Sequence, residues 1–249
     1  MLTAKRFGSL TLAVLAAAGA DALAQEPGPI VTKRPGFSFS PTTVGLSTLQ
    51  IESGYLYVSD DSGTGFDAQS LPLLLFRYGV AEDIEVQFGW GGYAWAEAGD
   101  VERDGATDAN VAVKWQVSDD DAAVPLALYA GFNLPIGASA FSSDESDPAI
   151  GAFWSYSAGL DWFGTVIVNN LDSTAVINNA VGINLPINDR FGSFVEYYGV
   201  FGDGGPEHYL NGGVTWLPEN NLQWDSYLGL GLNDRAIDVS FNLGLSYRY

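Results

Sequence analysis

The fold is decided by the last thirteen residues of the chain, residues 237–249, which read IDVSFNLGLSYRY. Each odd-numbered position carries an apolar or aromatic side chain, and each even-numbered position between them carries a small, polar or charged one. A period of two places these sets on opposite faces of a β-strand. A strand in a soluble protein usually has about five or six residues, whereas a tilted strand that crosses a bilayer needs about 9–11. The chain is therefore predicted to end as a transmembrane β-strand.

Stretches of similar length and alternation recur along the chain and are separated by turn residues. Twelve are recognised: residues 48–58, 70–78, 84–95, 108–117, 124–134, 149–158, 162–168, 175–185, 191–201, 208–217, 222–232 and 237–249. Pairs of asparagines blur the alternation in the seventh and eighth, so ten or fourteen strands remain alternatives. An even number is expected when both ends of a barrel lie on one side of the membrane. The predicted fold is all-β: a transmembrane, antiparallel, up-and-down β-barrel of about twelve strands, over residues 46–249.

Composition agrees with a barrel and excludes several other classes. The chain is 47% hydrophobic, but after the N-terminus it has no run of about 18 apolar residues, which argues against a helical membrane protein. Thirty glycines and 13% aromatic residues fit strands, turns and interfacial rings. A net charge of −20 makes nucleic acid a poor partner. The absence of cysteine excludes disulfides and thiolate metal sites.

The N-terminal region divides into two parts. Residues 1–24 are predicted to be a signal peptide, with Lys5 and Arg6 before a short apolar core and an Ala-Leu-Ala cleavage site at 22–24. An uncleaved anchor is the alternative. Residues 25–45 contain four prolines and are predicted to be irregular. This segment could enter the barrel as a plug, with Lys33 or Arg34 paired to Glu52, Glu85 or Glu196.

Loop lengths and aromatic residues give the barrel an orientation. The connections at 59–66, 96–107 and 135–148 are long and are expected to be extracellular, whereas the alternate connections are short and periplasmic. Aromatic side chains favour the headgroup level. The residues expected to form an aromatic girdle are Trp90, Trp115, Trp162, Trp216, Trp224 and Tyr247. The alternative is that the tryptophans belong to the core of a soluble β-sandwich.

The same alternation assigns charged residues to the inside of the barrel. The inward positions are Glu52, Arg77, Glu85, Asp108, Lys114, Glu196, Asp225, Asp238 and Arg248. Charges inside a barrel must be hydrated or paired. Hydration would indicate a water-filled path that disfavours anions, and pairing would indicate a plugged wall. The sequence leaves both open.

No pattern of residues points to catalysis. The single histidine, His208, lacks the spaced serine that outer-membrane phospholipases use, and Asp119-Asp120-Asp121 has no EF-hand spacing around it. Acidic residues abound, but none stands out as a glycosidase pair. The chain is therefore predicted to be non-enzymatic, with no cofactor or metal.

Several short motifs, in a fixed order across nearly all of the mature chain, resemble a family of bacterial outer-membrane proteins. They are the residues RPGFS at 34–38, LQIESGY at 49–55, SLP at 70–72, RYG at 77–79, FVEYYG at 194–199, YLNGG at 209–213 and GLGLN at 229–233. The family is labelled as transporters of the meta-cleavage pathway of phenol degradation. At Leu73 the chain departs from the family, which has a carboxylate there, so a partner for Arg77 is expected to be missing.

The resemblance implies a barrel of the bacterial outer membrane that passes small solutes, with hydrophobic or aromatic compounds as candidates. The C-terminal Tyr249 resembles the signal that hands such barrels to their assembly machinery, so the expected partners are the lipid bilayer, that machinery and a small solute. Two alternatives remain at this stage. One is a plugged barrel with a structural or loop-binding role, and the other is a secreted soluble β-sandwich.

Overall fold

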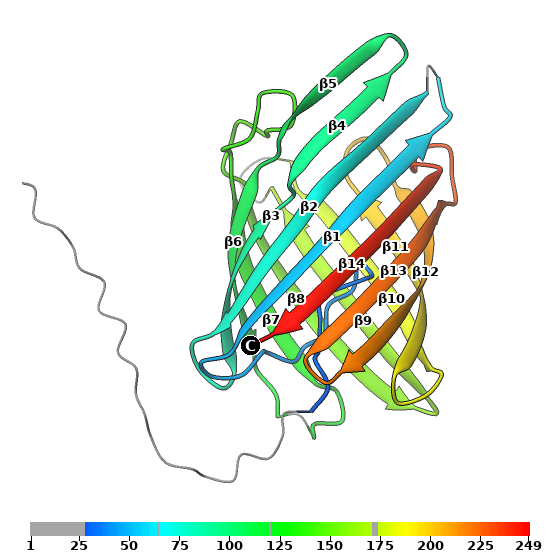
Figure 1. The fold of residues 1–249 in the computed structure, drawn as a ribbon. Coiled ribbons are helices and arrows are strands. Elements are labelled where there is room, and N and C mark those ends of the chain that lie inside the picture. Colours follow the sequence, from blue (N-terminus) through cyan, green and yellow to red (C-terminus); the bar gives the residue numbers. More distant parts are fainter. Residues whose placement is uncertain (1–27, 64, 120, 171–173) are drawn as a thin grey trace, which may run out of the picture.

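The structure is a computed structural model that describes residues 28–63, 65–119, 121–170 and 174–249 (Figure 1). The predicted signal peptide lies outside the described residues. In the part of the chain that is described, no helix is long and apolar enough to cross a membrane.

Fourteen β-strand segments form one antiparallel sheet. They are β1 (Leu49–Asp60), β2 (Phe66–Gly79), β3 (Ile84–Trp90), β4 (Tyr93–Ala98), β5 (Val101–Ala106), β6 (Ala109–Gln116), β7 (Leu126–Leu134), β8 (Pro148–Ala158), β9 (Leu160–Asn169), β10 (Val176–Pro186), β11 (Phe191–Phe201), β12 (Glu207–Glu219), β13 (Leu222–Gly231) and β14 (Val239–Arg248). Strand β1 pairs with both β2 and β14, so the sheet closes into a barrel.

The fourteen segments make twelve barrel strands, because two strands are interrupted. Strand β2 pairs with β3 through Leu74–Gly79 and with β4 through Asp67–Leu71, so β3 and β4 continue one another across Gly91 and Gly92. Their partners β6 and β5 continue one another in the same way. A Cβ atom at Gly92 would lie 2.5 Å from the carbonyl oxygen of Pro72, so the interruption needs a glycine. The predicted count of about twelve strands is confirmed.

The two predicted strands with blurred alternation form the full-length strands β9 and β10, which pair without a register shift. One local expectation needs revision. The connection predicted at 96–107 is instead mostly the hairpin of β4 and β5, which stays paired up to Ala98 and Val101. The charged residues of that stretch suggest a loop, and the run Glu102-Arg103-Asp104 in β5 breaks the period of two from which a strand is recognised.

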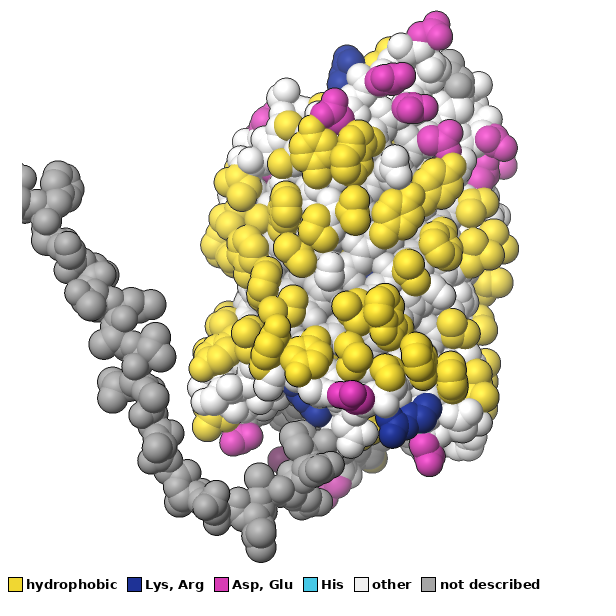
Figure 2. All heavy atoms as spheres, in the orientation of Figure 1, with side chains coloured by type: hydrophobic (Ala, Val, Ile, Leu, Met, Phe, Trp, Pro, Cys, Tyr) yellow, Lys and Arg dark blue, Asp and Glu magenta, His cyan; other side chains and the backbone are white. Residues whose placement is uncertain are grey.

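The outer surface is apolar over most of the barrel height and acidic at the end opposite the chain termini (Figure 2). Along β14, Leu243 is 47% exposed while its neighbour Asn242 is 4% exposed, which is the reverse of a soluble protein. Of the residues expected in the girdle, Trp115, Trp162, Trp216, Trp224 and Tyr247 are exposed on this surface.

Trp90 is placed differently from the other girdle candidates. It lies at the interruption between β3 and β4, is only partly exposed, and lines a cavity inside the barrel. Its indole Nε1 donates a hydrogen bond to the carbonyl oxygen of Thr107, at 3.1 Å. The break at Gly91 and Gly92 ends the regular alternation of inward and outward side chains. The alternation along β3 therefore does not predict where the Trp90 ring points.

Candidate functional site

Residues 28–48, here called the N-terminal segment, run inside the barrel (dark blue in Figure 1). They begin at the end where the C-terminus lies, because the Ile30 amide donates to the carbonyl oxygen of Asn220 at 2.6 Å and Arg248 donates to that of Gly28 at 2.6 Å. Pro29, Pro35 and Pro41 lack an N–H donor, which prevents this segment from adding a regular strand to the wall. Its remaining amides must therefore find acceptors on the wall.

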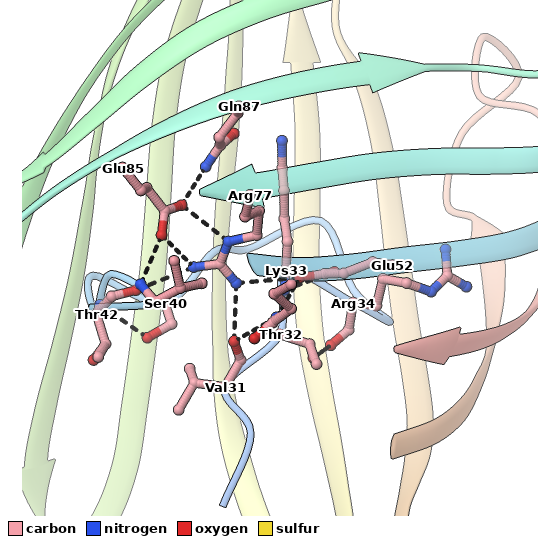
Figure 3. A network of polar contacts seen from close by, with 12 residues as sticks. Val31, Thr32, Lys33, Arg34, Ser40, Thr42, Glu52, Arg77, Glu85 and Gln87 are labelled. Carbon is pink, nitrogen blue, oxygen red and sulfur yellow. Dashed lines mark hydrogen bonds and ion pairs between the residues drawn. The ribbon is translucent and has the colours of Figure 1, made fainter. Parts of the chain in front are cut away.

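Arg77, on β2, is the centre of the contacts between the wall and the segment (Figure 3). Its guanidinium donates two hydrogen bonds to Glu85, both at 2.9 Å, and a third to Glu52 at 3.1 Å. It also donates to the carbonyl oxygens of Val31, at 2.9 Å, and Thr42, at 3.3 Å. The fork of the guanidinium thus joins three wall strands to two points on the N-terminal segment. The expectation that Arg77 lacks a partner because of Leu73 is wrong, since Glu85 and Glu52 take that role.

The carboxylates beside Arg77 also accept hydrogen bonds from backbone amides of the segment. The Lys33 amide lies 3.0 Å from both oxygens of Glu52, and the Val44 amide donates to Glu85 at 2.9 Å. Lys114 pairs with Glu85 at 3.5 Å and donates to the carbonyl oxygen of Thr42 at 2.6 Å. Acidic side chains of the wall therefore accept hydrogen bonds from amides of the segment, and basic side chains of the wall donate hydrogen bonds to its carbonyl oxygens.

Glu196, on β11, makes the same kind of contact on the opposite wall. Its two oxygens accept hydrogen bonds from the amides of Phe37, at 2.7 Å, and Ser38, at 3.1 Å. The Phe37 ring stacks on Tyr198 with 4.0 Å between centroids, and the Phe39 ring packs edge-on against Phe153. The segment therefore crosses the lumen from one wall to the other.

Arg34 enters a space that two glycines leave open. Gly54 and Gly244 face each other across β1 and β14, and a Cβ atom at Gly54 would lie 2.5 Å from Arg34 Nη1. The guanidinium bonds to Asp225, at 3.2 Å, and to Asn242. The sequence anticipates an ion pair for Arg34 but not the choice of Asp225, because strand parity alone does not show which carboxylates a segment without regular structure will reach.

The remaining inward candidates lie outside this group of contacts. Asp238 precedes β14, is exposed, and accepts a hydrogen bond from the Asp61 amide at 2.9 Å. Arg248 lies at the rim where the N-terminal segment enters. Asp108 binds the amides of Gly137 and Ser143, each at 2.9 Å, and so anchors the loop that follows β7. The alternation of the strands assigns these three residues to the inside of the barrel. Because each lies at or just beyond the end of a strand, they are found at the two ends of the barrel instead.

The charges around the segment are matched. Four carboxylates of the wall, Glu52, Glu85, Glu196 and Asp225, face four cations, namely Lys33, Arg34, Arg77 and Lys114. The sequence leaves open whether the charges in the lumen are hydrated or paired. Around the N-terminal segment they are paired or hydrogen-bonded. The acidic excess of the chain lies elsewhere, and Figure 2 shows acidic side chains concentrated at the end opposite the termini.

The N-terminal segment leaves cavities on both of its sides. One of about 560 Å³ lies towards the end with the termini and is lined by Ser38, Asp161 and Gln223 among others. Two others, of about 450 Å³ and 300 Å³, lie towards the opposite end. Phe39 lines all three. Lys33 lies over the Phe39 ring, with its Nζ 3.9 Å from the centroid, so these two side chains mark the narrow part of the lumen.

Comparison with known proteins agrees with this architecture. The family model described as "Putative MetA-pathway of phenol degradation" matches residues 32–249. An outer membrane channel from Pseudomonas putida F1 is similar in structure, with a TM-score of 0.65 and 12% identity over 87% of this chain and 99% of that one. The KdgM porin has a TM-score of 0.52 and 12% identity over 80% of this chain and 98% of that one. No curated protein matches the chain.

Proposed function

The chain belongs to the family described as "Putative MetA-pathway of phenol degradation", and we propose that it forms a channel for passive passage of small solutes across the bacterial outer membrane. The observation that carries this proposal is the chain of cavities inside the barrel, which share Phe39 as a common wall residue. A solute that passes Phe39 and Lys33 moves from one half of the lumen to the other. The narrow part is built from the N-terminal segment, so conductance depends on how firmly that segment is held.

Ion selectivity in this proposal comes from the outer rim. Of the four wall carboxylates near the segment, Glu52, Glu85 and Asp225 are paired with cations. Glu196 instead accepts hydrogen bonds from the amides of Phe37 and Ser38. Together with the four nearby cations, these carboxylates present little net charge to a passing ion. The acidic side chains at the extracellular end lie where an ion first meets the protein, and they favour cations and neutral solutes over anions. No residue is assigned a catalytic role in this proposal.

The test is single-channel recording in planar bilayers. We expect small steps with the full mature chain and larger steps when Phe39→Ala widens the narrow part. Deleting residues 28–45 should increase conductance further, although the wall charges then lose partners and the barrel could fail to form, so Phe39→Ala is the decisive variant. Unchanged conductance in Phe39→Ala, or selectivity for anions, would contradict the proposal.

The second candidate is a plugged barrel with a structural or loop-binding role. The number of hydrogen bonds between wall and segment favours it, because each must break before the segment can leave. Silent bilayers for the full chain and for Phe39→Ala would support this candidate. The third expectation, a secreted soluble β-sandwich, is wrong, because the strands close into one barrel whose outward side chains are apolar.

A further inference from the structure

Several side-chain amides line the cavity of about 450 Å³ that lies on the extracellular side of Phe39. This cavity, here called the amide cavity, is bounded by the N-terminal segment and by the inner face of the sheet from β6 to β11. Its asparagines are Asn110, Asn133, Asn169, Asn170 and Asn178, and Tyr129, Tyr198 and Thr165 add hydroxyl groups. An amide carries both hydrogen-bond donors and acceptors, so this wall can bind a polar molecule that has no charge.

The asparagine pairs that blur the alternation in the sequence contribute to this wall. On β10, the inward Asn178 lines the amide cavity, and the inward Asn184 lines the cavity on the other side of the N-terminal segment. Asn169 ends β9 and pairs with Ala149 of β8, and both residues line the amide cavity. Asn170 follows with a φ of 56°, a conformation that asparagine adopts more readily than most residues. The departure from the strand pattern therefore coincides with the polar part of the cavity.

Several of these amides have hydrogen-bonding capacity left for a ligand. The Oδ1 atom of Asn178 accepts a hydrogen bond from the Tyr198 hydroxyl at 2.7 Å, and its Nδ2 donates to no other described residue. The side chains of Asn169 and Asn170 form no hydrogen bond with the part of the chain that the structure describes. Asn133, in contrast, donates to the loop after β7. An apolar ligand would remove water from the free amides without replacing its hydrogen bonds, whereas a hydroxyl group replaces them.

The charges that line the amide cavity are balanced. Lys33 and Asp147 are its only charged lining residues among those described. The Lys33 ammonium lies over the Phe39 ring and has no ion-pair or hydrogen-bond partner among the described residues. Figure 3 shows the Lys33 side chain extending away from the contacts around Arg77. One charge of each sign gives neither anions nor cations an overall advantage, which favours a neutral ligand.

The size of the amide cavity and its rings fit a single sugar ring. Ligand pockets in proteins are commonly about 300–1,000 Å³. A cavity of about 150 Å³ holds benzene, and a monosaccharide has about twice as many heavy atoms. Phe37 and Phe39 of the N-terminal segment also line the cavity, and an aromatic ring offers a flat apolar surface to the C–H groups of a sugar. The hydroxyl groups of the same molecule can then meet the amides of the wall.

From these observations we propose that the amide cavity is a binding site for neutral, polyhydroxylated molecules of monosaccharide size. The proposal rests on the proposed function and deepens it by naming a class of solute, but binding at this site can be measured without any transport. This class differs from the hydrophobic or aromatic compounds that the family resemblance implies, because those compounds would leave the amides without partners.

The test is ¹⁹F NMR titration of the protein in lipid nanodiscs with 2-deoxy-2-fluoro-D-glucose, and empty nanodiscs are the reference. Asn178→Leu and Asn169→Leu each remove one amide from the cavity at similar side-chain volume. Asn184→Leu is the matched control, because it makes the same change on β10 in the cavity on the other side of the N-terminal segment. Toluene and D-glucuronate, an anion of similar size to the probe, are added as competitors. The electrophoretic shift of folded barrels shows that each variant has folded.

We expect saturable binding by the wild type and by Asn184→Leu, and at least fivefold weaker binding by Asn178→Leu and Asn169→Leu. Equal binding by the wild type and a folded Asn169→Leu, in which the change lies at a strand end, would overturn the site. Displacement of the probe by toluene or D-glucuronate as readily as by D-glucose would overturn the ligand class. Absence of saturable binding would show a wall that is only hydrated and would overturn the proposal. Failure of the channel function would appear separately, as silent bilayers with intact binding.

Discussion

Replacing Arg77 with methionine is the sharpest perturbation of the contacts that hold the N-terminal segment. Methionine has similar length and no charge, so the change removes three hydrogen bonds to Glu52 and Glu85 and two to carbonyl oxygens of the segment. Both carboxylates are at most 1% exposed and would lose their strongest partner. Removing one member of a buried ion pair costs about 3–5 kcal/mol. We therefore expect Arg77→Met to destabilise the barrel by about that amount.

The assay is equilibrium unfolding in urea of barrels refolded into lipid vesicles, followed by the electrophoretic shift between folded and unfolded forms. Arg103→Met is the control, because Arg103 is exposed and, among the described residues, donates one hydrogen bond, to the carbonyl oxygen of Glu102. This change should alter stability by less than about 0.5 kcal/mol. The double variant Arg77→Met, Glu85→Gln should lose less than the sum of the single variants, because the second change removes the charge that the first leaves unpaired. Arg77→Met with wild-type stability, or strictly additive losses, would refute the reasoning.

Three further outcomes are expected. Glu196→Gln keeps a single good acceptor for the amides of Phe37 and Ser38, so it should lower unfolding stability by about 1–3 kcal/mol in the same urea assay and increase the frequency of large conductance steps. Asp108→Asn should weaken the anchoring of the loop after β7, which would show as faster cleavage there in limited proteolysis while the barrel stays resistant; unchanged cleavage would contradict this role. Tyr249→Ala keeps the backbone hydrogen bond to Leu49 and removes a ring that is 71% exposed, so refolded barrels should be as stable as wild type while outer-membrane levels fall on immunoblots; normal levels would show that Tyr249 is not an assembly signal.

The strands could be predicted from the sequence because each depends on the same local pattern of alternating side chains. An alternating pattern of about ten residues assigns both the strand and its two faces, and β14 is the clearest case. Parity also places Glu52, Arg77 and Glu85 on one side of the wall. The pattern fails at Trp90 because the backbone breaks at Gly91 and Gly92. It fails in β5 because three consecutive charged residues hide the period of two in a strand that is regularly paired with β4.

The contacts of the N-terminal segment could not be read in the same way. Its prolines exclude a regular structure, and an irregular chain has no period from which the direction of a side chain follows. The pairing of Arg34 with Asp225 depends on the space above Gly54 and Gly244, which exists only once β1 and β14 lie side by side. Glycines and acidic residues at inward positions are the signal that the sequence offers. That signal does not distinguish an open channel from a space that an arginine side chain fills.

The wall carboxylates acquire a structural role from these contacts. A segment without regular structure that crosses a narrow lumen carries amides with no strand partner, and each buried amide without an acceptor costs about 1–3 kcal/mol. Glu52, Glu85 and Glu196 supply acceptors to the amides of Lys33, Val44, Phe37 and Ser38. Acidic residues inside this barrel are therefore required to hold the segment, and their number is no guide to which ions pass. In the proposed channel, selectivity depends on acidic groups outside these contacts, and Figure 2 shows acidic side chains concentrated at the end of the barrel opposite the termini.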